Sequence, residues 1–538
     1  MRQFTWLAAS KPIRHLLLAW CVCYAGDLAA FTAASVYAFH AGGAGLVAVL
    51  GLLKALPGAL LVPLLTSSAD RVRRERLLIA SVAARALLLA AAAAATTGGG
   101  QGILVVVLVG LQGGLGSVFR QVQAALLPWL ARTPDELTSA NSAASVLQSA
   151  AMVGGPALAA GLLAVSTAQA AMLAACGLLA AGAGLLAGVR PRSSPAPGPA
   201  AGRLAQLKDD MAEGFQAGVR RGAVPLVIPA AVQTFARGVL TVLTVVIALD
   251  LFSLGSSAVG WLGAALGAGG ILAGPLALLL VRGRRVARCF AAGVAGWGVP
   301  FILLAFAHAP YWPYLAFAGI GVANVVGDVA VYSSLQQVIP SRLTGRALGA
   351  RRGVLLLSMG LGSAITPVLL HAWGARGTLL ATGALLAAAA AGFWPHLAAL
   401  DHQIAAPGPD LALLRQVPFF RPLPYAVLEH LATELQPATY QPGEVIITEG
   451  DPGDRFYLIA AGRARASKNG QPLNEITAPG SFGEIALLRP IPRVVTITAT
   501  IHLDARTLAR EEFLAAVTGS PESAQSADQV VSTWLRVG

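Results

Sequence analysis

Long apolar runs alternate with short polar breaks over about the first 400 residues of the chain. A helix needs roughly 20 apolar residues to cross the hydrocarbon core of a bilayer, and twelve runs reach about that length. They lie near residues 14–39, 44–66, 77–96, 102–126, 142–165, 168–188, 223–250, 256–281, 287–308, 313–338, 350–371 and 376–397. The pattern predicts an all-α polytopic membrane protein with twelve transmembrane helices.

The predicted spans divide into two sets of six around a polar stretch. An N-terminal bundle is expected over residues 1–190, a connector that ends in an amphipathic helix over 191–222, and a C-terminal bundle over 223–398. The fourth spans of the two halves end alike, in AALLPWLARTPDEL and SLQQVIPSRLTGRAL. Two repeated six-helix bundles are expected to face one central cavity, as in transporters whose halves rock against each other.

The composition agrees with a membrane location. Of the 538 residues, 56% are hydrophobic and 12% are charged, and the mean hydropathy of +0.68 lies outside the range of ordinary soluble domains. The first apolar run is long and eleven more follow it, which argues against a cleaved secretory signal. All four cysteines fall in predicted spans, so we expect neither a disulfide nor a metal site. They are Cys21, Cys23, Cys176 and Cys289.

Basic residues gather in one set of loops, whereas the opposite set offers only Arg376. The basic set comprises Lys11, Arg14, Arg71, Arg73, Arg74, Arg76, Arg132, Arg190, Arg192, Arg203, Arg282, Arg284, Arg285, Arg288, Arg342 and Arg346. Lys and Arg favour the cytoplasmic side of short loops, so both termini are expected in the cytoplasm. The same asymmetry accounts for the formal net charge of +13, and we therefore expect no nucleic-acid partner.

Six charged residues lie well inside predicted spans. They are Asp27, Lys54, Arg85, Arg120, Arg237 and Asp328. Ionisable groups there are costly and usually face a cavity or a charged partner, so each is either a transport residue or part of a buried ion pair. We interpret Asp27, Lys54, Arg120 and Asp328 as candidates for a transport cavity or for coupling, and the other two as structural. The two carboxylates are the candidates for a proton-carrying group.

Several stretches resemble the major facilitator superfamily, in particular its bacterial efflux-type members. SSADRVRR, after the second span, is similar to the loop signature of that family and matches it at Asp70, Arg71 and Arg74. A Gly155-Pro156 pair in VGGPALAAG resembles the antiporter signature of the fifth helix. VGWLGAALGAGGILAG and LQQVIPSRLTGRALG complete the resemblance. It implies a secondary transporter in a bacterial plasma (inner) membrane, with its lipid bilayer, a small-molecule substrate and protons as partners.

The pattern changes after the last span. A linker is expected over residues 399–410 and a soluble domain over 411–538. This domain begins with apolar residues at helical spacing and continues as short alternating segments separated by glycines, which is typical of a β jelly roll. Ser520-Pro521-Glu522 predicts the start of a last helix. We therefore expect a C-terminal β jelly-roll domain with flanking helices.

The segment GSFGEIALLRPIPR, residues 480–493, combines groups that suit a sugar and a phosphate. A helical turn after glycine can point the backbone N–H groups of Ile485 and Ala486 at an anion. The Glu484 carboxylate can accept hydrogen bonds from a sugar hydroxyl, and the Arg493 guanidinium can pair with a phosphate. A cyclic nucleotide carries both ligand groups close together.

This segment resembles the cyclic-nucleotide-binding domain shared by the catabolite activator protein, the regulatory subunits of protein kinase A and nucleotide-gated channels. The matching positions are Phe482, Gly483, Glu484, Ala486, Leu487, Pro492 and Arg493. The resemblance implies that Glu484 holds the ribose 2′-hydroxyl, that Arg493 holds the cyclic phosphate and that Trp534 covers the base. Val494 lacks the hydroxyl that helps to hold guanine in this family, so cyclic AMP is expected over cyclic GMP. The sequence stops after the predicted last helix, which carries Trp534, so no DNA-reading helix-turn-helix is expected.

Together these features predict a secondary active exporter of a small molecule, regulated by cyclic AMP at a cytoplasmic C-terminal domain. One alternative is a membrane receptor that has a transporter fold without net transport. Another is that the nucleotide itself is the transported substrate. An enzyme is not expected, because no nucleophile–base or metal constellation occurs in the sequence.

Overall fold

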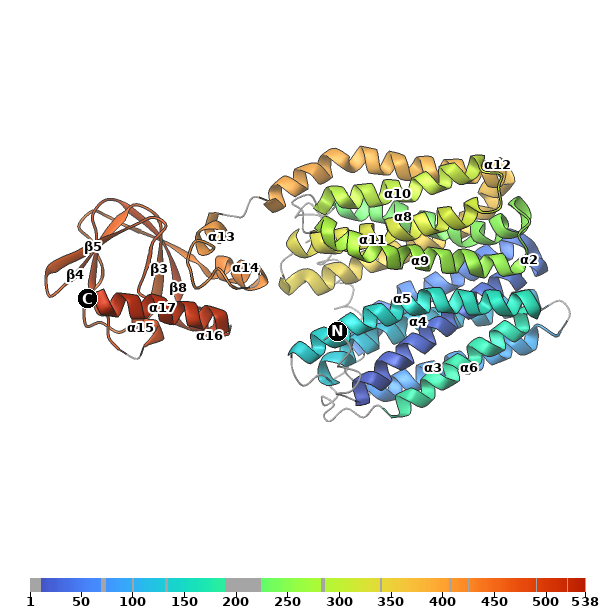
Figure 1. Ribbon diagram of the computed structural model, residues 1–538, viewed down its shortest axis with the longest axis horizontal. Coiled ribbons are helices and arrows are strands. Elements are labelled where there is room, and N and C mark those ends of the chain that lie inside the picture. Colours follow the sequence, from blue (N-terminus) through green and yellow to red (C-terminus); the bar gives the residue numbers. More distant parts are fainter. Residues whose placement is uncertain are drawn as a thin grey trace. The chain divides into compact units, whose positions relative to one another are not determined.

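The computed structural model describes residues 11–68, 74–98, 101–130, 134–188, 224–281, 286–338, 341–405, 409–423, 425–489, 491–519 and 521–537. The chain forms two compact units, Met1–His402 and Gln403–Gly538. The first is helical and the second contains the strands (Figure 1). The connector expected over 191–222 and the loop residues Asp70 and Arg71 lie outside the described residues.

Long apolar helices build the first unit. They are α2 (Lys11–Ser68), α3 (Arg74–Ala95), α4 (Gly102–Leu130), α5 (Pro134–Val165), α6 (Ala168–Ala187), α8 (Val224–Val246), the π-helix η2 (Ile247–Leu251), α9 (Ser256–Val281), α10 (Val286–Phe306), α11 (Trp312–Val338) and α12 (Ser341–Ala405). Within the described residues, nine helical stretches are long and apolar enough to cross a membrane. The predicted polytopic helical architecture is confirmed.

Two of these helices each contain two predicted spans. Helix α2 leaves helical geometry at Gly42 and Gly43, and α12 does so at Gly374. Gly43 and Gly374 have φ angles of +62° and +66°, which only glycine adopts without strain. The chain therefore turns at these glycines between successive spans, and the exact count of twelve stays a prediction.

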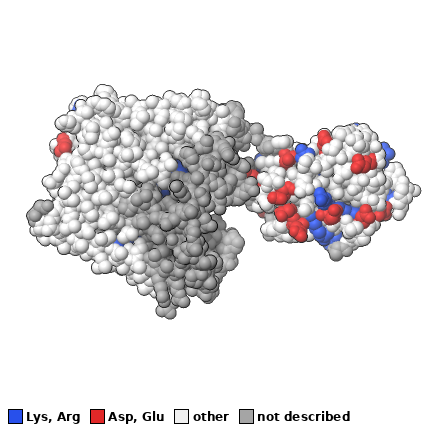
Figure 2. All heavy atoms as spheres, turned by 180° about the vertical axis from the view of Figure 1, so that it is seen from behind, with Lys and Arg blue, Asp and Glu red and all other residues white. Residues whose placement is uncertain are grey.

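The helices form two groups that follow the two halves of the sequence. Helix α2 packs with α4, α5 and α6 in the first half, and α11 packs with α9 and α10 in the second, while α5 lies along α9. Figure 1 shows α3–α6 on one side and α8–α12 on the other. The described surface of this unit carries few charged side chains on the face seen in Figure 2, in contrast to the second unit. An outer surface with few charges suits contact with lipid, because charged groups are costly within a bilayer.

Small residues allow the helix backbones to approach closely. A Cβ atom added at Gly238 of α8 would lie 2.0 Å from the Met359 carbonyl oxygen of α12, and one added at Gly362 of α12 would lie 2.1 Å from the Phe235 carbonyl oxygen of α8. Ser363 Oγ donates a hydrogen bond to the Gly238 carbonyl at 3.0 Å. Close packing of small residues is a main source of helix association in membranes.

A buried carboxylate fixes the end of α12. Asp401 is 2% exposed and accepts hydrogen bonds from the backbone N–H groups of Ala287 and Arg288 at 2.7 and 3.1 Å, and from Arg288 Nε at 2.9 Å. A carboxylate is favourable at the positive N-terminal end of a helix, here α10. Because of this contact, α12 continues to Ala405, into the segment expected as a linker over 399–410.

The second unit is a sandwich of two four-stranded sheets, in the orders β1-β8-β3-β6 and β2-β7-β4-β5, and its strands pair antiparallel. The strands are β1 (Gln436–Tyr440), β2 (Val445–Ile447), β3 (Arg455–Ala461), β4 (Arg463–Lys468), β5 (Gln471–Thr477), β6 (Ser481–Phe482), β7 (Thr496–Ala499) and β8 (Leu503–Ala509). The flanking helices are α13 (Pro409–Leu414), α14 (Tyr425–Glu434), α15 (Ile485–Leu488), α16 (Arg510–Thr518) and α17 (Pro521–Val537). The predicted β domain with flanking helices is confirmed.

An aromatic cluster joins the helices to the first sheet. The rings of Phe419, Phe420, Phe456 and Phe513 have centroids 4.8 to 5.9 Å apart, and all four side chains are buried. Such pairs add stability beyond the burial of apolar area. Ser523 Oγ of α17 donates a hydrogen bond to the Phe419 carbonyl oxygen, so the start of the last helix is anchored to this cluster.

The glycine contact between α8 and α12 generates a stability prediction. Gly238→Ala is expected to lower the thermal unfolding temperature of the purified protein, because overpacking costs about 1–3 kcal/mol and the obstructing atom is a backbone oxygen. Gly274→Ala in α9 is the matched control, since a Cβ there meets nothing within 4 Å. Unfolding in detergent is followed by tryptophan fluorescence, and equal unfolding temperatures for both variants would contradict the packing role.

Candidate functional site

A cavity of about 390 Å³ lies in the C-terminal unit, and we call it the C-terminal cavity. Its lining residues are Ile447, Ala466, Lys468, Leu473, Asn474, Ile476, Ser481, Phe482, Gly483, Glu484, Ile485, Ala486, Arg493, Val494, Val495 and Ile497. Most residues that the sequence singled out for this site are among them. Pro492 lies beside the lining and is exposed, and Trp534 belongs to α17, where its side chain is outside the described part.

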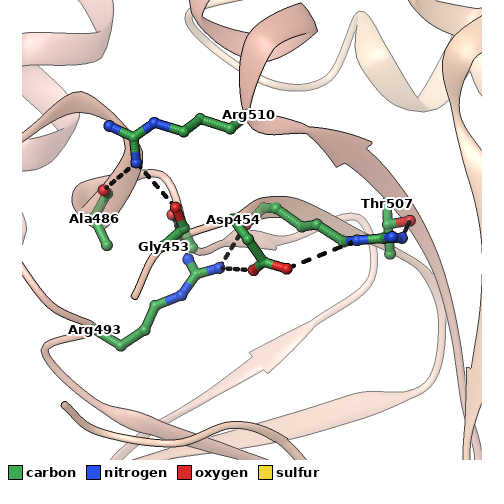
Figure 3. A network of polar contacts seen from close by, with 8 residues as sticks. Gly453, Asp454, Ala486, Arg493, Thr507 and Arg510 are labelled. Atoms are coloured by element: carbon green, nitrogen blue, oxygen red, sulfur yellow. Dashed lines mark hydrogen bonds and ion pairs between the residues drawn. The ribbon is translucent and has the colours of Figure 1, made fainter. Parts of the chain in front are cut away.

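The Arg493 guanidinium is buried and oriented by three acceptors. The residue is 5% exposed. Its Nη1 donates to the Gly483 carbonyl oxygen at 2.8 Å. Its Nη2 donates to the Arg455 carbonyl oxygen at 2.8 Å and to Asp454 Oδ1 at 3.2 Å (Figure 3). A guanidinium has five N–H donors, so these contacts fix the side chain and leave two donors for an anionic ligand.

Asp454 is the centre of a wider network that the sequence reasoning missed. Its second carboxylate oxygen lies 3.9 Å from Arg455 Nε, and Arg455 Nη1 donates to Thr507 Oγ1 at 3.5 Å (Figure 3). The network therefore reaches from the cavity to β8. An acidic residue directly before a strand was the available signal, but the strand pairing that brings it to Arg493 cannot be read from that position alone.

A second arginine supports the turn at α15. Arg510 Nη1, at the start of α16, donates to the Gly453 carbonyl oxygen at 2.9 Å and to the Ala486 carbonyl oxygen at 3.3 Å (Figure 3). One guanidinium thus links the loop before β3 to the turn that carries Ile485 and Ala486. The first backbone N–H groups of α15 belong to these two residues, and both line the cavity.

Gly483 is required by the geometry of the site. Its φ angle is +94°, and an added Cβ would lie 2.8 Å from Arg493 Nη1 and 3.1 Å from the Arg455 carbonyl oxygen. A left-handed conformation favours glycine, and the close approach leaves no space for a side chain. The position before Glu484 therefore needs glycine for two independent reasons.

The Glu484 carboxyl group is buried without a full set of partners. The residue is 4% exposed, and its Oε2 atom has no hydrogen-bond partner among the described residues. Burial raises the pKa of this carboxyl group to about 7, while a hydrogen bond to its own backbone and the charge of Arg493 act in the opposite direction. An unsatisfied buried acceptor is costly, so a ligand hydroxyl at Oε2 would be stabilising.

The remaining wall of the cavity is mostly apolar. It is formed by side chains that point inward from β4 and β5, including Ala466, Lys468, Asn474 and Ile476. The sequence reasoning did not identify Lys468 and Asn474, although both follow the period of two that places alternate strand residues on one face. A compact ligand with one anionic group, one hydroxyl and a flat apolar part matches these surroundings.

A second cavity, of about 500 Å³, lies in the helical unit, and we call it the helical cavity. Both halves of the sequence line it, with Tyr24, Asp27, Leu28, Phe31, Lys54, Ala55, Gln112, Gly113, Gly116, Gln148, Met152, Ala230, Gln233, Thr234, Arg237, Asn324, Asp328, Tyr332, Arg351, Arg352, Leu355, Leu356 and Met359. The structure thus brings Asp27, Lys54 and Asp328 together. Arg120 lies in α4, but its side chain is outside the described part.

Asp27 is part of a closed polar cluster. Arg85, which is 0% exposed, forms an ion pair with it, and Gln112 Nε2 donates a hydrogen bond to its Oδ1 at 2.6 Å. Residues of α2, α3 and α4 therefore meet at this carboxylate. The charge of Asp27 is largely satisfied by its own helix bundle.

Arg237 and Asp328 are linked through an amide in the second half. Arg237 donates a hydrogen bond to Asn324 Oδ1, and Asn324 Nδ2 donates to Asp328 Oδ2 at 3.2 Å. The Arg237 guanidinium also lies 5.4 Å from the centre of the Trp297 ring. Gln112, Gln233, Asn324, Arg351 and Arg352 line the helical cavity but were not identified from the sequence. Polar amides within an apolar run were the signal available for the first three.

Known proteins resemble the C-terminal unit over short stretches. The cAMP-dependent protein kinase regulatory subunit of Eremothecium gossypii is 39% identical over 101 residues, which are 19% of this chain and 22% of that protein. The Acetyltransferase Pat of Mycolicibacterium smegmatis is 44% identical over 94 residues, 17% of this chain and 27% of that protein. The chain thus spans about a quarter of the length of these curated relatives.

Two solved structures are similar to short parts of the chain. A structure described as Sp-2Cl-cAMPS bound to PKAR CBD2 is 28% identical and covers 24% of this chain and 92% of its own, with a TM-score of 0.22. The regulatory domain of Toxoplasma gondii PKA with cAMP is also 28% identical and covers 20% of this chain and 43% of its own, with a TM-score of 0.20.

Two family models match separate parts of the chain. The model of the cyclic nucleotide-binding domain matches residues 437–519, which include the C-terminal cavity. The model of the Major Facilitator Superfamily matches residues 16–350, more than half of the chain. The chain therefore belongs to the Major Facilitator Superfamily and carries a C-terminal cyclic nucleotide-binding domain.

Proposed function

We propose that the protein is a secondary active transporter that exports a small molecule from a bacterial cell, and that cyclic AMP bound to the C-terminal domain regulates its cycle. The observation that carries the regulatory part is the pair of buried groups in one cavity. Arg493 is held in place with N–H donors to spare, and Glu484 has an unpartnered carboxylate oxygen. A cyclic phosphate and a ribose hydroxyl complement these two groups.

The proposed pose assigns a part of the nucleotide to each wall. The phosphate lies between Arg493 and the backbone N–H groups of Ile485 and Ala486, and the ribose 2′-hydroxyl donates to Glu484. The base lies against the apolar wall, and Trp534 of α17 covers it. Names of the similar proteins, which include regulatory subunits of a cAMP-dependent kinase, support cyclic AMP as the ligand.

The helical unit is proposed to carry the substrate through the helical cavity. Walls from both halves of the sequence are what a rocking mechanism requires, since each half must contact the substrate from one side. Since Asp27 is paired with Arg85, Asp328 is the better candidate for a carboxylate that takes up and releases a proton during each transport cycle. The proposed orientation places both termini and the C-terminal domain in the cytoplasm, as the basic loops favour.

The covalent connection offers a route for regulation. Helix α12 ends at Ala405 and α13 begins at Pro409, so the two units are joined by a short segment. Asp401 ties the end of α12 to the start of α10. We propose that a change within the C-terminal domain on nucleotide binding is transmitted along the chain to α12 and, through Asp401, to α10. The effect can be no larger than the difference in nucleotide affinity between the transporter states.

Two alternatives remain distinct from this proposal. A receptor without transport would have no need for a cavity lined by charged residues of both halves. If the nucleotide were the transported substrate, a separate cavity in the C-terminal domain would have no role. Each alternative predicts a different result in the experiments below.

Removing the arginine is expected to weaken nucleotide binding most. Arg493→Ala should raise the dissociation constant of cyclic AMP about ten- to a hundredfold, because a hydrogen bond to a charged group contributes about 1.5–3 kcal/mol. Glu484→Gln, which keeps the shape of the side chain, should weaken binding less. Titration calorimetry on the full-length protein in detergent measures both effects.

The control for this experiment is Arg465→Ala in β4, whose guanidinium is exposed and paired with Glu475 at 3.2 Å. It should leave the affinity unchanged. The same titration with cyclic GMP tests the preference expected from Val494, which lines the cavity without a hydroxyl. Wild-type affinity in Arg493→Ala would refute the assignment of the site.

Binding of cyclic AMP is expected to depend on pH through Glu484. With a pKa of about 7 in the empty cavity, the carboxyl group is mostly protonated below this pH and ionised above it. The ionised form is the stronger acceptor for the ribose hydroxyl, so binding should release a proton. Affinity should rise between about pH 6 and pH 8, by no more than about tenfold per pH unit, and Glu484→Gln should remove this rise.

The same pKa has a consequence for the empty domain. In the unfolded chain the carboxyl group has a pKa near its ordinary value of 4.5. As the pH rises above this value, ionisation stabilises the unfolded state, while the carboxyl group of the folded domain is still protonated. The empty domain should therefore lose stability between about pH 4.5 and pH 7. A flat binding profile in the wild type would show that the ionisation of Glu484 is not linked to the nucleotide.

Regulation is expected to appear as a shift between transporter states. Spin labels at Gly45→Cys and Ala375→Cys, in a background without the four native cysteines, lie beside the glycine turns of α2 and α12. Cyclic AMP should change the populations of the distance distribution about 5- to 150-fold, the range of a 1–3 kcal/mol coupling. Arg493→Ala should abolish the response. Unchanged distances in a protein that still binds cyclic AMP would show that the domain does not regulate the cycle.

A further inference from the structure

The helical cavity has more positive than negative charge on its walls. Four basic and two acidic side chains are among the described residues that line it. The basic residues are Lys54, Arg237, Arg351 and Arg352, and the acidic residues are Asp27 and Asp328. Charged groups within a membrane are expensive and usually pair with one another or mark the path of a substrate, so the unequal numbers need a physical account.

Both carboxylates that line the cavity have partners within the protein. Asp27 is paired with Arg85, which does not line the cavity, and it also accepts a hydrogen bond from Gln112. The negative charge of Asp27 is therefore paired with a residue outside the cavity lining. Asp328 is linked to Arg237 through the Asn324 amide. By formal charge, the described lining residues carry four basic and two acidic side chains, an excess of two positive charges.

Two buried N–H donors on the cavity wall lack an acceptor among the described residues. Arg351 is 7% exposed and Gln233 is 6% exposed, and both line the cavity. The Nε atom of Arg351 and the Nε2 atom of Gln233 have no hydrogen-bond partner among the described residues. Each atom is an N–H donor, and a buried donor without an acceptor is costly. A ligand that presents acceptor oxygens would relieve both.

Aromatic rings contact two of the basic side chains that line the cavity. The Arg351 guanidinium lies 5.1 Å from the centre of the Tyr332 ring, and Lys54 Nζ lies 3.6 Å from the centre of the Phe31 ring. Contacts of this kind attract a cation to the ring face without supplying a full opposite charge. The rest of the wall includes apolar residues such as Met152, which suit a carbon skeleton.

We infer that the helical cavity binds an organic anion, with its acidic group at Arg351 and Gln233 and its apolar part against the aromatic and aliphatic wall. This inference rests on the proposal that the helical unit is a transporter, and it names the chemical class of its substrate. A volume of about 500 Å³ falls within the range of small-molecule sites. An organic cation of the same size would meet the excess positive charge and would find no acceptor at Arg351, whose guanidinium only donates.

The test compares aromatic probes of opposite charge on the full-length protein in lipid nanodiscs. Carboxyfluorescein, an anion, should bind saturably by fluorescence anisotropy, whereas ethidium, a cation, should not. Arg351→Gln should weaken carboxyfluorescein at least about tenfold, and Arg351→Lys, which keeps the charge, should weaken it less. Arg376→Gln is the matched control, because Arg376 contacts His308 and does not line the cavity.

Flux from proteoliposomes separates this inference from the transport proposal. Loss of carboxyfluorescein efflux in Arg351→Gln, with efflux retained in Arg376→Gln, is the expected result. Efflux of ethidium without carboxyfluorescein would overturn the inference and leave a transporter of cations. If neither probe is bound or moved while cyclic AMP still binds, the inference is wrong and the receptor alternative is favoured.

Discussion

A charge that leaves water needs an opposite charge or a set of hydrogen bonds, and this constraint shapes both units of the protein. Where the need is met inside the chain, the buried charge holds the fold together. The Asp27 carboxylate joins three helices through its contacts with Arg85 and Gln112, and Asp401 fixes the end of α12 on α10. Where the need is not met, a donor or acceptor faces a cavity, as Glu484 Oε2 and Arg351 Nε do.

The nucleotide site could be predicted from the sequence because its main anchors are close in the chain. Glu484 and Arg493 flank one short turn, and the surrounding residue types suit only a few ligands. Asp454 and Arg510 were missed, although both are part of the same network (Figure 3). They reach the site through the pairing of β3 with β8 and through the start of α16. Tertiary contacts of this kind leave no local pattern.

The helical unit was predictable in a different respect. The length of each apolar run gives the spans, and the cost of a buried charge identifies Asp27, Lys54 and Asp328 as exceptional. The partner of each charge could not be predicted, since Arg85 lies 58 positions from Asp27. Arg351 was missed because it lies at the predicted start of a span, where a basic residue is ordinary. An apolar run defines the length of a helix but leaves open which face meets the cavity.

The two cavities hold their arginine side chains by unlike contacts, and the difference suits the tasks that we propose for them. In the C-terminal cavity, three acceptors hold the Arg493 guanidinium in one orientation, which favours tight and selective binding through preorganisation. In the helical cavity, Arg351 lies over the Tyr332 ring, and its Nε atom has no hydrogen-bond partner among the described residues, so fewer contacts restrain this side chain. A transporter must release what it binds, and its walls from the two halves must separate in each cycle. A rigid site therefore suits the regulator, and an adaptable site suits the substrate.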